Sequence, residues 1–395
     1  MSEKQILQDL KATFTELYGG EPEGLFFAPG RVNLIGEHTD YNGGHVFPCA
    51  LTIGTYAAAR KRDDDRVLFA SMNKGKAVVE ELTLDQVNEG KRDHWTDYPA
   101  GVISAFAANN HELPSGFEVV FYGNVPAGSG LSSSASLEVV TGIILRTLFG
   151  MDDVRQVDLA LWGQKAECDY VGMQCGIMDQ FASAMGKKNT AMFLDVNTMI
   201  CDNAPLILPG MKIVITNSEV KHQLASSEYN VRRAECEAAL TELRKVRPSL
   251  KTLGELSPEE FDEIAHYISD ETKRKRAKHA VYENARTVAA YKALKEKGDI
   301  REFGRLMNES HDSLQYDYEV SCPEIDFLVA EGRKIDGVLG TRITGGGFGG
   351  CTVSIIKDEA IDEFRKHLTE AYEKKYHVTP EFYVVEPSDG AKVLE

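Results

Sequence analysis

The sequence predicts a two-domain protein of mixed α and β structure. Its 395 residues exceed the usual length of one domain, and 43% of them are hydrophobic, which suffices for a globular core. The first half carries a helical pattern, then short β-rich runs, then helices, and the second half returns to strands near its end. Because Pro205, Pro209 and Gly210 interrupt the pattern, we expect domains of residues 1–205 and 206–395.

The elements of the first half follow from hydrophobic spacing. Residues 1–20 mix charged and apolar residues at helical spacing, which predicts an amphipathic helix. Short β-rich runs at 46–51, 67–71 and 117–122 predict strands. From Leu137 onward, apolar residues recur at intervals of three and four, which predicts helix.

The second half begins with the apolar run 212–217, which predicts a strand. Four helical segments follow, strands return at Val338, and the chain closes with helix and strand. In one long helix, Asp270 is a candidate N-cap, and the basic run 273–279 is expected to form the exposed face.

Composition limits the partners. Lys and Arg total 44 against 61 Asp and Glu, and the resulting net charge of −17 opposes binding to nucleic acid or to an anionic membrane. The seven cysteines form no CxxC pair and no even-numbered framework, which fits a reducing cytoplasm. No signal peptide or membrane-spanning run is predicted. We expect a cytoplasmic monomer.

The most informative motif is GRVNLIGEHTDYNGG at residues 30–44. Between two glycine turns it places both charge signs and both donor and acceptor groups within a few positions. These residues are Arg31, Asn33, Glu37, His38, Thr39, Asp40 and Asn42. Such a density of hydrogen-bonding groups is typical of a site for sugar hydroxyls, whereas a solvated surface run is the alternative.

A second motif, GNVPAGSGLSSSASLEVV at residues 123–140, places glycines and small hydroxyls directly before a helix. A helix start offers unpaired N–H groups and the positive end of the dipole, and glycines let phosphate oxygens approach the main chain. The segment therefore suits a nucleotide triphosphate, although a serine-rich cap with nothing bound is the plain alternative. The candidate residues are Gly128, Ser129, Gly130, Leu131, Ser132, Ser133 and Ser134.

Other phosphate and dinucleotide motifs are absent or weak. No GxxxxGK[ST], HRD or DFG occurs, so no P-loop lysine holds the phosphates. The cluster TGGGFGGC at 344–351 contains GxGxxG, but the β-rich run CTVSII follows it. A dinucleotide fingerprint opens a helix instead, so we expect a glycine turn between two strands.

Two candidate acidic residues follow in the sequence. Glu167 is expected on one helix, and Asp179 is expected near the start of the next helix. Magnesium takes oxygen ligands, usually one or two protein groups besides phosphates, which Ser134 and Glu167 can supply. Phosphoryl transfer to a hydroxyl needs an acceptor for the hydroxyl proton and a cation for the transferring group. Asp179 and Arg31 suit these two roles.

Together, these stretches resemble the galactokinase family of GHMP small-molecule kinases. The resemblance extends from Ala28 through GLSSSAS, CGIMDQ and SSEYNVRR to TGGGFGGC, without departure at a motif position. It implies an N-terminal mixed-sheet α/β domain, a ferredoxin-like C-terminal α+β domain, and an active site in the cleft between them.

The resemblance also implies site roles. Glu37, His38, Asp40 and Tyr229 would contact galactose, and Thr39 is a further candidate substrate-binding residue. Asp179 and Arg31 would act on the anomeric hydroxyl and the transition state, and residues 128–134 would hold ATP. Magnesium would lie at Ser134 and Glu167. Tyr229 has an alternative role in helix packing, and Trp95 would either flank the adenine or fill the core.

Two other functions stay open on the sequence. An N-acetylgalactosamine kinase would differ in the room beside the second carbon of the sugar. A galactose-sensing regulator would keep the fold and ligands without turnover, although the intact Arg31, Ser134, Glu167 and Asp179 argue against it.

Overall fold

A computed structural model describes residues 2–75, 77–126, 130–220 and 225–395. Its helices are α1 Glu3–Tyr18, α2 Leu84–Asn88, α3 Asp97–Ala108, α4 Ser133–Leu148, α5 Gln156–Lys165, α6 Met178–Met185, α7 Ala225–Leu243, α8 Pro258–Ile264, α9 Glu271–Lys292, α10 Ile300–Ser313, α11 Pro323–Gly332 and α12 Ile361–Tyr376. Its strands are β1 Gly24–Asn33, β2 His45–Val46, β3 Pro48–Lys61, β4 Arg66–Ser71, β5 Glu80–Thr83, β6 Phe117–Gly123, β7 Thr190–Asp195, β8 Ile200–Pro205, β9 Met211–Asn217, β10 Val338–Thr344, β11 Cys351–Lys357, β12 Glu381–Val385 and β13 Lys392–Val393.

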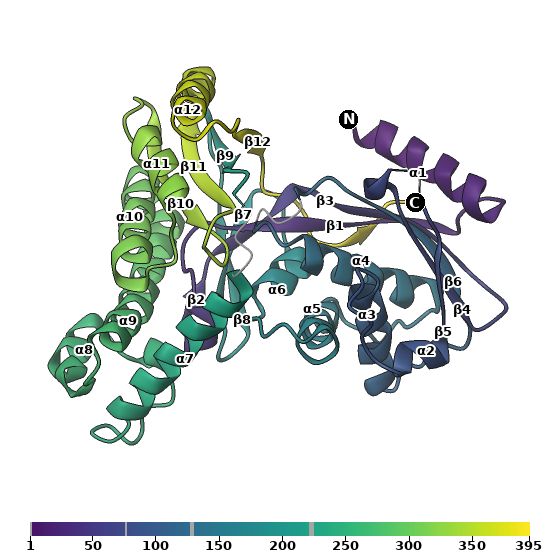
Figure 1. Ribbon diagram of the computed structural model, residues 1–395, viewed down its shortest axis with the longest axis horizontal. Coiled ribbons are helices and arrows are strands. Elements are labelled where there is room, and N and C mark those ends of the chain that lie inside the picture. The colour runs from purple at the N-terminus through teal and green to yellow at the C-terminus, as the bar shows by residue number, and fades with distance from the viewer. Residues whose placement is uncertain (1, 76, 127–129, 221–224) are drawn as a thin grey trace.

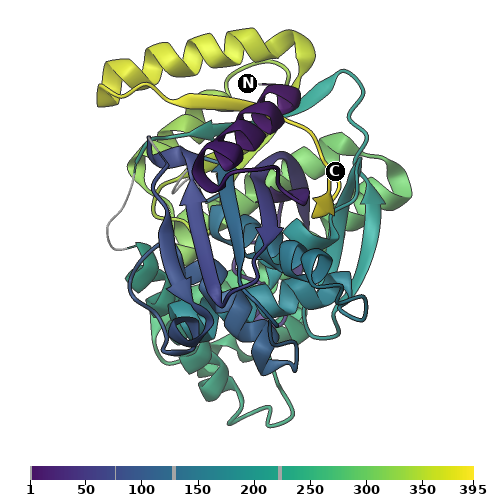
Figure 2. The same cartoon turned by 90° about the vertical axis from the view of Figure 1, so that its right-hand side faces the viewer.

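The first part of the chain is built around a six-stranded mixed sheet in the order β13-β1-β3-β6-β4-β5. Only the β4–β6 pair is parallel among these neighbours. Helix α1 covers one face of the sheet, and α3, α4, α5 and α6 lie on the other (Figure 1). Figure 2 shows α1, in dark purple, in front of the strands.

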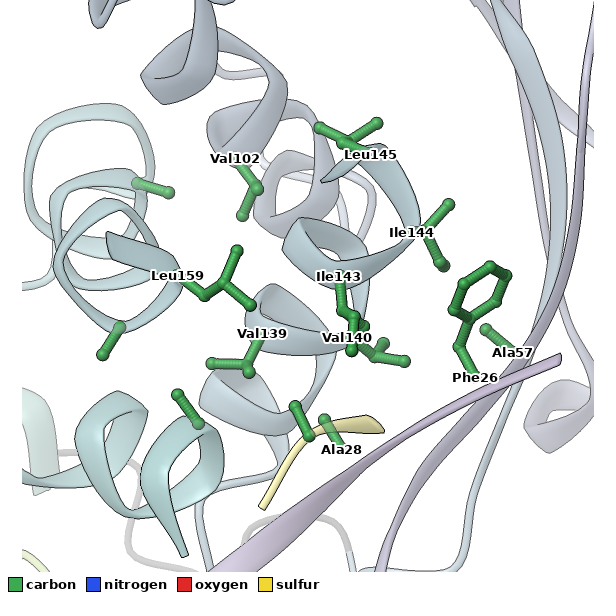
Figure 3. Close-up of a cluster of buried hydrophobic side chains, with 14 of the residues drawn as sticks. Phe26, Ala28, Ala57, Val102, Val139, Val140, Ile143, Ile144, Leu145 and Leu159 are labelled. Atoms are coloured by element: carbon green, nitrogen blue, oxygen red, sulfur yellow. The ribbon is translucent and has the colours of Figure 1, made fainter. Parts of the chain in front are cut away.

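Strand β1 is buried along its whole length. Leu25 and Phe27 pack under α1, whereas Phe26 and Ala28 face the helices on the opposite side. Figure 3 shows Phe26 and Ala57 of the paired strands pointing toward Ile144 of α4. Because both faces are covered, β1 lacks the apolar and polar alternation that marks a half-exposed strand, and the sequence did not predict it.

The second part contains a four-stranded antiparallel sheet in the order β10-β11-β9-β12. In chain order it runs strand, helices, two strands, helix α12 and strand, which is the ferredoxin-like arrangement that we expected. Helices α7 to α11 form the inserted helical layer on the left of Figure 1. A third sheet, β2-β7-β8, lies between the two parts.

We propose the domain division near residue 205, where β8 ends. The end of the chain returns across it, since β13 pairs with β1 at Val393 and Phe26. One apolar cluster also joins residues of β1, such as Val32, to residues of β9 and β11, such as Ile213 and Val353. The two parts therefore share packed core.

Most predicted elements are confirmed, with shifted ends. The N-terminal helix, the strands at 67–71, 117–122 and 212–217, and the return of strands at Val338 agree with the structure. The run 46–51 is divided between β2 and β3, and α4 begins at Ser133, before Leu137. Trp95 is partly buried and packs edge-on against Phe69 and Phe121 at the border of the core.

The basic run 273–279 was expected on the exposed face of a helix, and this was wrong in part. Asp270 does cap α9, because its side chain accepts from the Lys273 N–H. However, Arg276 and His279 are buried. Arg276 is paired with Glu235 and Glu319, so the inward face of α9 is partly polar.

Candidate active site

A single cleft of about 740 Å³ collects the motifs of both parts of the chain. Of the predicted site residues, its walls include Arg31, Glu37, His38, Asp40, Gly130, Ser132, Ser133, Ser134, Glu167, Asp179 and Tyr229. Gly128 and Ser129 lie outside the described residues. Thr39 and Leu131 are described but do not line the cleft.

Asp179 and Arg31 form the centre of the cleft. Asp179 lies in the first turn of α6, and the buried Arg31 lies near the end of β1. Arg31 Nε donates to Asp179 Oδ1 at 2.8 Å, and Nη2 lies 2.7 Å from the same oxygen. The hydroxyl of Ser132 donates to Oδ2 at 2.6 Å. The carboxylate is therefore held from both sides.

The start of α4 is left without a side-chain cap. Ser132, its N-cap residue, has a left-handed backbone with φ 60°, and its hydroxyl bonds to Asp179 instead of the helix. The next residues, Ser133 and Ser134, line the cleft. The first N–H groups and the positive end of the helix dipole are thus available to an anion there.

The third glycine cluster is confirmed as a turn between strands, here β10 and β11. Gly345 has φ 88°, and a β-carbon on it would lie 2.9 Å from the carbonyl oxygen of Gly130. The Arg31 Nη1 group donates to that same oxygen at 2.6 Å. The close approach of the two glycine segments therefore requires glycine at position 345.

Glu37 is held by residues of the second part of the chain. Its Oε1 accepts from the Gly345 N–H at 2.8 Å and from the Thr344 hydroxyl at 3.2 Å. The fully buried Arg342 places Nη2 at 3.4 Å from the same oxygen. The Glu37 side chain is thus held by β10 and by the glycine that follows this strand.

His38 is buried in an aromatic wall with Tyr41, Tyr229 and Tyr318. Burial and the nearby His279 hold the pKa of His38 well below its usual range, so the imidazole is neutral. Its Nδ1 bonds to the Tyr41 hydroxyl at 2.7 Å, whereas Nε2 has no hydrogen-bond partner. Among the described residues, this buried ring nitrogen is thus left unsatisfied.

Asp40 also lines the cleft. Burial, together with the charge of Asp179, raises the pKa of Asp40 to about 6. Its Oδ1 accepts from the Tyr41 N–H at 3.0 Å. This carboxyl group is therefore near its titration midpoint under mildly acidic conditions.

Thr39 and Leu131 support the loops from behind. The Thr39 hydroxyl lies 2.8 Å from the Gly36 carbonyl oxygen and 2.6 Å from that of His45, and it can donate to one at a time. Leu131 is buried, and its carbonyl accepts from the Arg31 N–H at 3.2 Å.

The donor set at Ser134 and Glu167 fits magnesium. Both side chains line the cleft, and each carries an oxygen that can bind a hard cation. Burial and the charge of Asp179 raise the pKa of Glu167 to about 7. The described residues contain no cluster of three or more His, Cys, Asp or Glu ligands. Two oxygen ligands completed by phosphates are the usual set for this ion.

Sequence reasoning missed a buried group behind Glu167. Gln180 Nε2 donates to Glu167 Oε2 at 2.6 Å and to Glu138 Oε2 at 2.8 Å. Burial and the charge of Glu167 raise the pKa of Glu138 well above its usual range. Glu138 and Gln180 each lie within one of the motifs described above. Their contact joins α4 to α6, so no pattern within a single stretch of sequence could predict it.

Sequence reasoning also missed the inner face of α9. His279 Nε2 lies 3.1 Å from the Glu37 carbonyl oxygen, and Glu283 accepts from the Gly36 N–H at 3.0 Å. Asn284 accepts from the His45 N–H at 2.8 Å. The signal available in the sequence was the spacing of these polar residues. His279 and Glu283 are four positions apart and therefore lie on the same face of α9. The adjacent residues His311, Asp312 and Ser313 do not form a catalytic triad, because Ser313 bonds to His279 and Asp312 pairs with Arg333.

Comparison with known proteins places this site in a family. Models of the GHMP kinase N-terminal and C-terminal domains match residues 97–187 and 290–374. Together with the two-part fold, they define an ATP-dependent GHMP small-molecule kinase. A galactokinase galactose-binding signature matches residues 12–61, which include the sugar motif.

Curated relatives cover nearly the whole chain. A galactokinase of Clostridium beijerinckii is 52% identical over 98% of both chains, and one of Clostridium acetobutylicum is 50% identical over 98% of this chain and 99% of the relative. The chain belongs to the galactokinase family. The expected resemblance and fold are thereby confirmed.

Solved structures agree. The galactokinase of Lactococcus lactis complexed with galactose matches with a TM-score of 0.95 and 43% identity, over 98% of this chain and 100% of that one. A mevalonate kinase of Methanococcus jannaschii matches with a TM-score of 0.64 at 18% identity, over 94% of this chain and 99% of that one, which is a likeness of fold alone. Among the residues that the structure describes, no helix has the length and apolar character to cross a membrane.

Proposed function

We propose that this protein transfers the γ-phosphoryl group of ATP to the anomeric hydroxyl of α-D-galactose, giving galactose 1-phosphate and ADP. The observation that carries this proposal is the position of Asp179, which lies in one cleft with the sugar motif and with the start of α4. The related L. lactis enzyme was solved with galactose, which supports the same sugar here.

Asp179 is the proposed acceptor of the anomeric hydroxyl proton. Its two oxygens are held by Arg31 and Ser132, so the carboxylate is oriented before the sugar enters. Arg31 is proposed to stabilise negative charge on the transferring group. A preorganised cation costs no reorganisation during the reaction, which is why such groups contribute strongly to phosphoryl transfer.

Glu37, His38, Asp40 and Tyr229 are the proposed galactose contacts. The free Nε2 of His38 and the carboxylate of Asp40 supply different partners for hydroxyl groups. Thr39 is assigned to the support of the loop, since its hydroxyl faces backbone carbonyls. A buried group left without its hydroxyl costs about 1 to 3 kcal/mol, so we expect strong discrimination against glucose.

Residues 128–134 are the proposed phosphate loop, with Ser133 and Ser134 at the uncapped start of α4. Ser134 and Glu167 would hold Mg²⁺, which when bound neutralises phosphate charge. We further infer a monomer that works in the cytoplasm, a compartment in which thiols are ordinarily kept reduced.

Coupled ADP release tests this proposal. MgATP is offered with galactose, N-acetylgalactosamine, glucose or mevalonate to the wild type and to Asp179→Asn, and galactose binding is measured separately by equilibrium dialysis. We expect turnover with galactose, and loss of turnover with retained galactose binding in Asp179→Asn. Full turnover by Asp179→Asn would refute the assigned base. Preference for N-acetylgalactosamine would identify that kinase, and binding without turnover by the wild type would identify a sensor.

A further inference from the structure

Two thiols meet on the wall of the cleft. The sulfur atoms of Cys168 and Cys175 lie 3.7 Å apart, and the residues are seven positions apart in the chain. Cys168 belongs to the π-helical turn Ala166–Val171 that continues α5, and Cys175 belongs to the segment before α6. Neither thiol has a part in the phosphoryl transfer described above.

We propose that Cys168 and Cys175 are a modification site, at which a low-molecular-weight disulfide converts the two thiols to an internal disulfide and lowers turnover. Disulfide formation requires a sulfur–sulfur distance of about 2.0 Å. The two sulfur atoms are already in contact at 3.7 Å, so they must approach each other by about 1.7 Å for the bond to form. The Cys168 sulfur also contacts the carbonyl oxygen of Cys175 at 3.8 Å, which keeps the two residues together.

The pair is accessible to a small reagent. Both cysteines are partly exposed, and Cys175 lines the cleft. Cys49, Cys236, Cys322 and Cys351 are buried. Cys201 is also partly exposed, but its sulfur faces the carbonyl oxygen of Asp202 at 4.0 Å. Cys201 therefore serves as the internal control.

The chemistry is thiol–disulfide exchange in two steps. The thiolate of one cysteine attacks the small disulfide, which forms a mixed disulfide and releases one small thiol. The second cysteine then attacks the protein sulfur of the mixed disulfide and releases the other small thiol. The protein loses two S–H hydrogens, the small disulfide gains them, and a dithiol reductant reverses both steps.

The effect on turnover arises from Glu167. In the reduced protein the Cys175 thiol faces Glu167 Oε2 at 3.7 Å, as a weak donor. A disulfide removes this S–H group and joins Cys175 to the residue next to Glu167. This consequence rests on the proposed role of Glu167, whereas formation of the disulfide does not.

The test uses the full-length reduced protein treated with oxidised glutathione. Free thiols are counted after denaturation, the disulfide is mapped by peptide mass spectrometry, and galactose-dependent ADP release is measured before and after dithiothreitol. We expect two thiols to be lost, one peptide pair joined through Cys168 and Cys175, and a fall in turnover of about tenfold or more that dithiothreitol reverses.

Variants separate this site from other thiols, each compared with its own reduced rate. Cys168→Ser should lose the sensitivity to oxidised glutathione, and Cys201→Ser should keep it. Unchanged thiol counts, or a stable glutathione adduct without the internal bond, would overturn the modification site. A mapped Cys168–Cys175 disulfide with unchanged turnover would overturn the effect on catalysis, even if galactose phosphorylation itself is confirmed.

Discussion

Gly176 lies directly against the carboxylate of Asp40: a β-carbon on Gly176 would fall 1.6 Å from Asp40 Oδ2. The segment before α6 therefore presses against the sugar motif at a point where no side chain fits. The backbone of Gly176 has no positive φ, so the constraint is contact and not conformation. Asp40 is thus positioned by a residue far away in the chain.

Gly176→Ala should displace the Asp40 carboxylate and weaken galactose recognition. We expect kcat/KM for galactose to fall by about 10²-fold, with a smaller change in KM for MgATP. Gly123→Ala is the matched control, because a β-carbon there meets nothing closer than 3.8 Å. Steady-state kinetics with each substrate varied would check this, and an unchanged KM for galactose would contradict it.

Galactose affinity should depend on the ionisation of Asp40. Because burial and Asp179 raise the pKa of Asp40 to about 6, its acceptor oxygens are progressively protonated as pH falls through that value. KM for galactose should therefore rise between about pH 7.5 and about pH 5.5. His38 does not titrate in this range, since its pKa is held well below the usual value.

Asp40→Asn provides the control and a stability test. The variant should bind galactose more weakly, with a flat profile around pH 6. The pKa of Asp40 in the folded protein, about 6, lies above the pKa of an ordinary Asp, about 3.9. The ionised carboxylate therefore lowers the free energy of unfolding at about pH 6 and above, and this cost is absent below about pH 4. Asn should raise the free energy of unfolding by on the order of 1 to 3 kcal/mol at neutral pH only. An Asn variant with the wild-type pH profile would contradict this.

Arg31→Lys should impair catalysis more than binding. Lysine cannot contact Asp179 through two nitrogens and the Gly130 carbonyl through a third, as Arg31 does. We expect kcat to fall by about 10² to 10³-fold, with KM for galactose within a few fold. Arg155→Lys, which alters an exposed pair with Asp158, should leave both parameters unchanged. A defect confined to KM would contradict the catalytic role.

Gln180 should set the metal affinity of Glu167. Gln180→Leu leaves the buried carboxyls of Glu138 and Glu167 without their shared donor. We expect Mn²⁺, used as a spectroscopic substitute for Mg²⁺, to bind about 10 to 100-fold more weakly by electron paramagnetic resonance. Thermal unfolding should show a loss of about 1 to 3 kcal/mol.

Glu138→Gln tests whether the shape or the charge of the Glu138 side chain matters for metal binding. Burial and Glu167 raise the pKa of Glu138 well above its usual range, which favours the uncharged acid. The neutral amide should therefore leave Mn²⁺ affinity close to that of the wild type. A loss as large as that of Gln180→Leu would mean that Glu138 acts as a carboxylate.

The sequence by itself determined the local features of this protein. A helix after the serine-rich motif, the glycine turn before Cys351 and the place of Asp179 near the start of a helix were predicted, because helix starts and glycine turns depend on neighbouring residues. The exact start of α4, at Ser133, was not predicted, since helix was expected only from Leu137. The motifs also identified the family. Strand β1 was missed, since burial on both faces removes the alternation by which strands are recognised.

Only the tertiary structure decided how these motifs work together. Arg342 and Gly345 hold Glu37 from more than 300 positions away, and Glu283 of α9 holds the loop at Gly36. The end of the chain returns to pair with β1, and Thr39 turns away from the cleft to its own loop. These contacts arise from packing between distant segments, and no spacing within a single stretch of sequence encodes them.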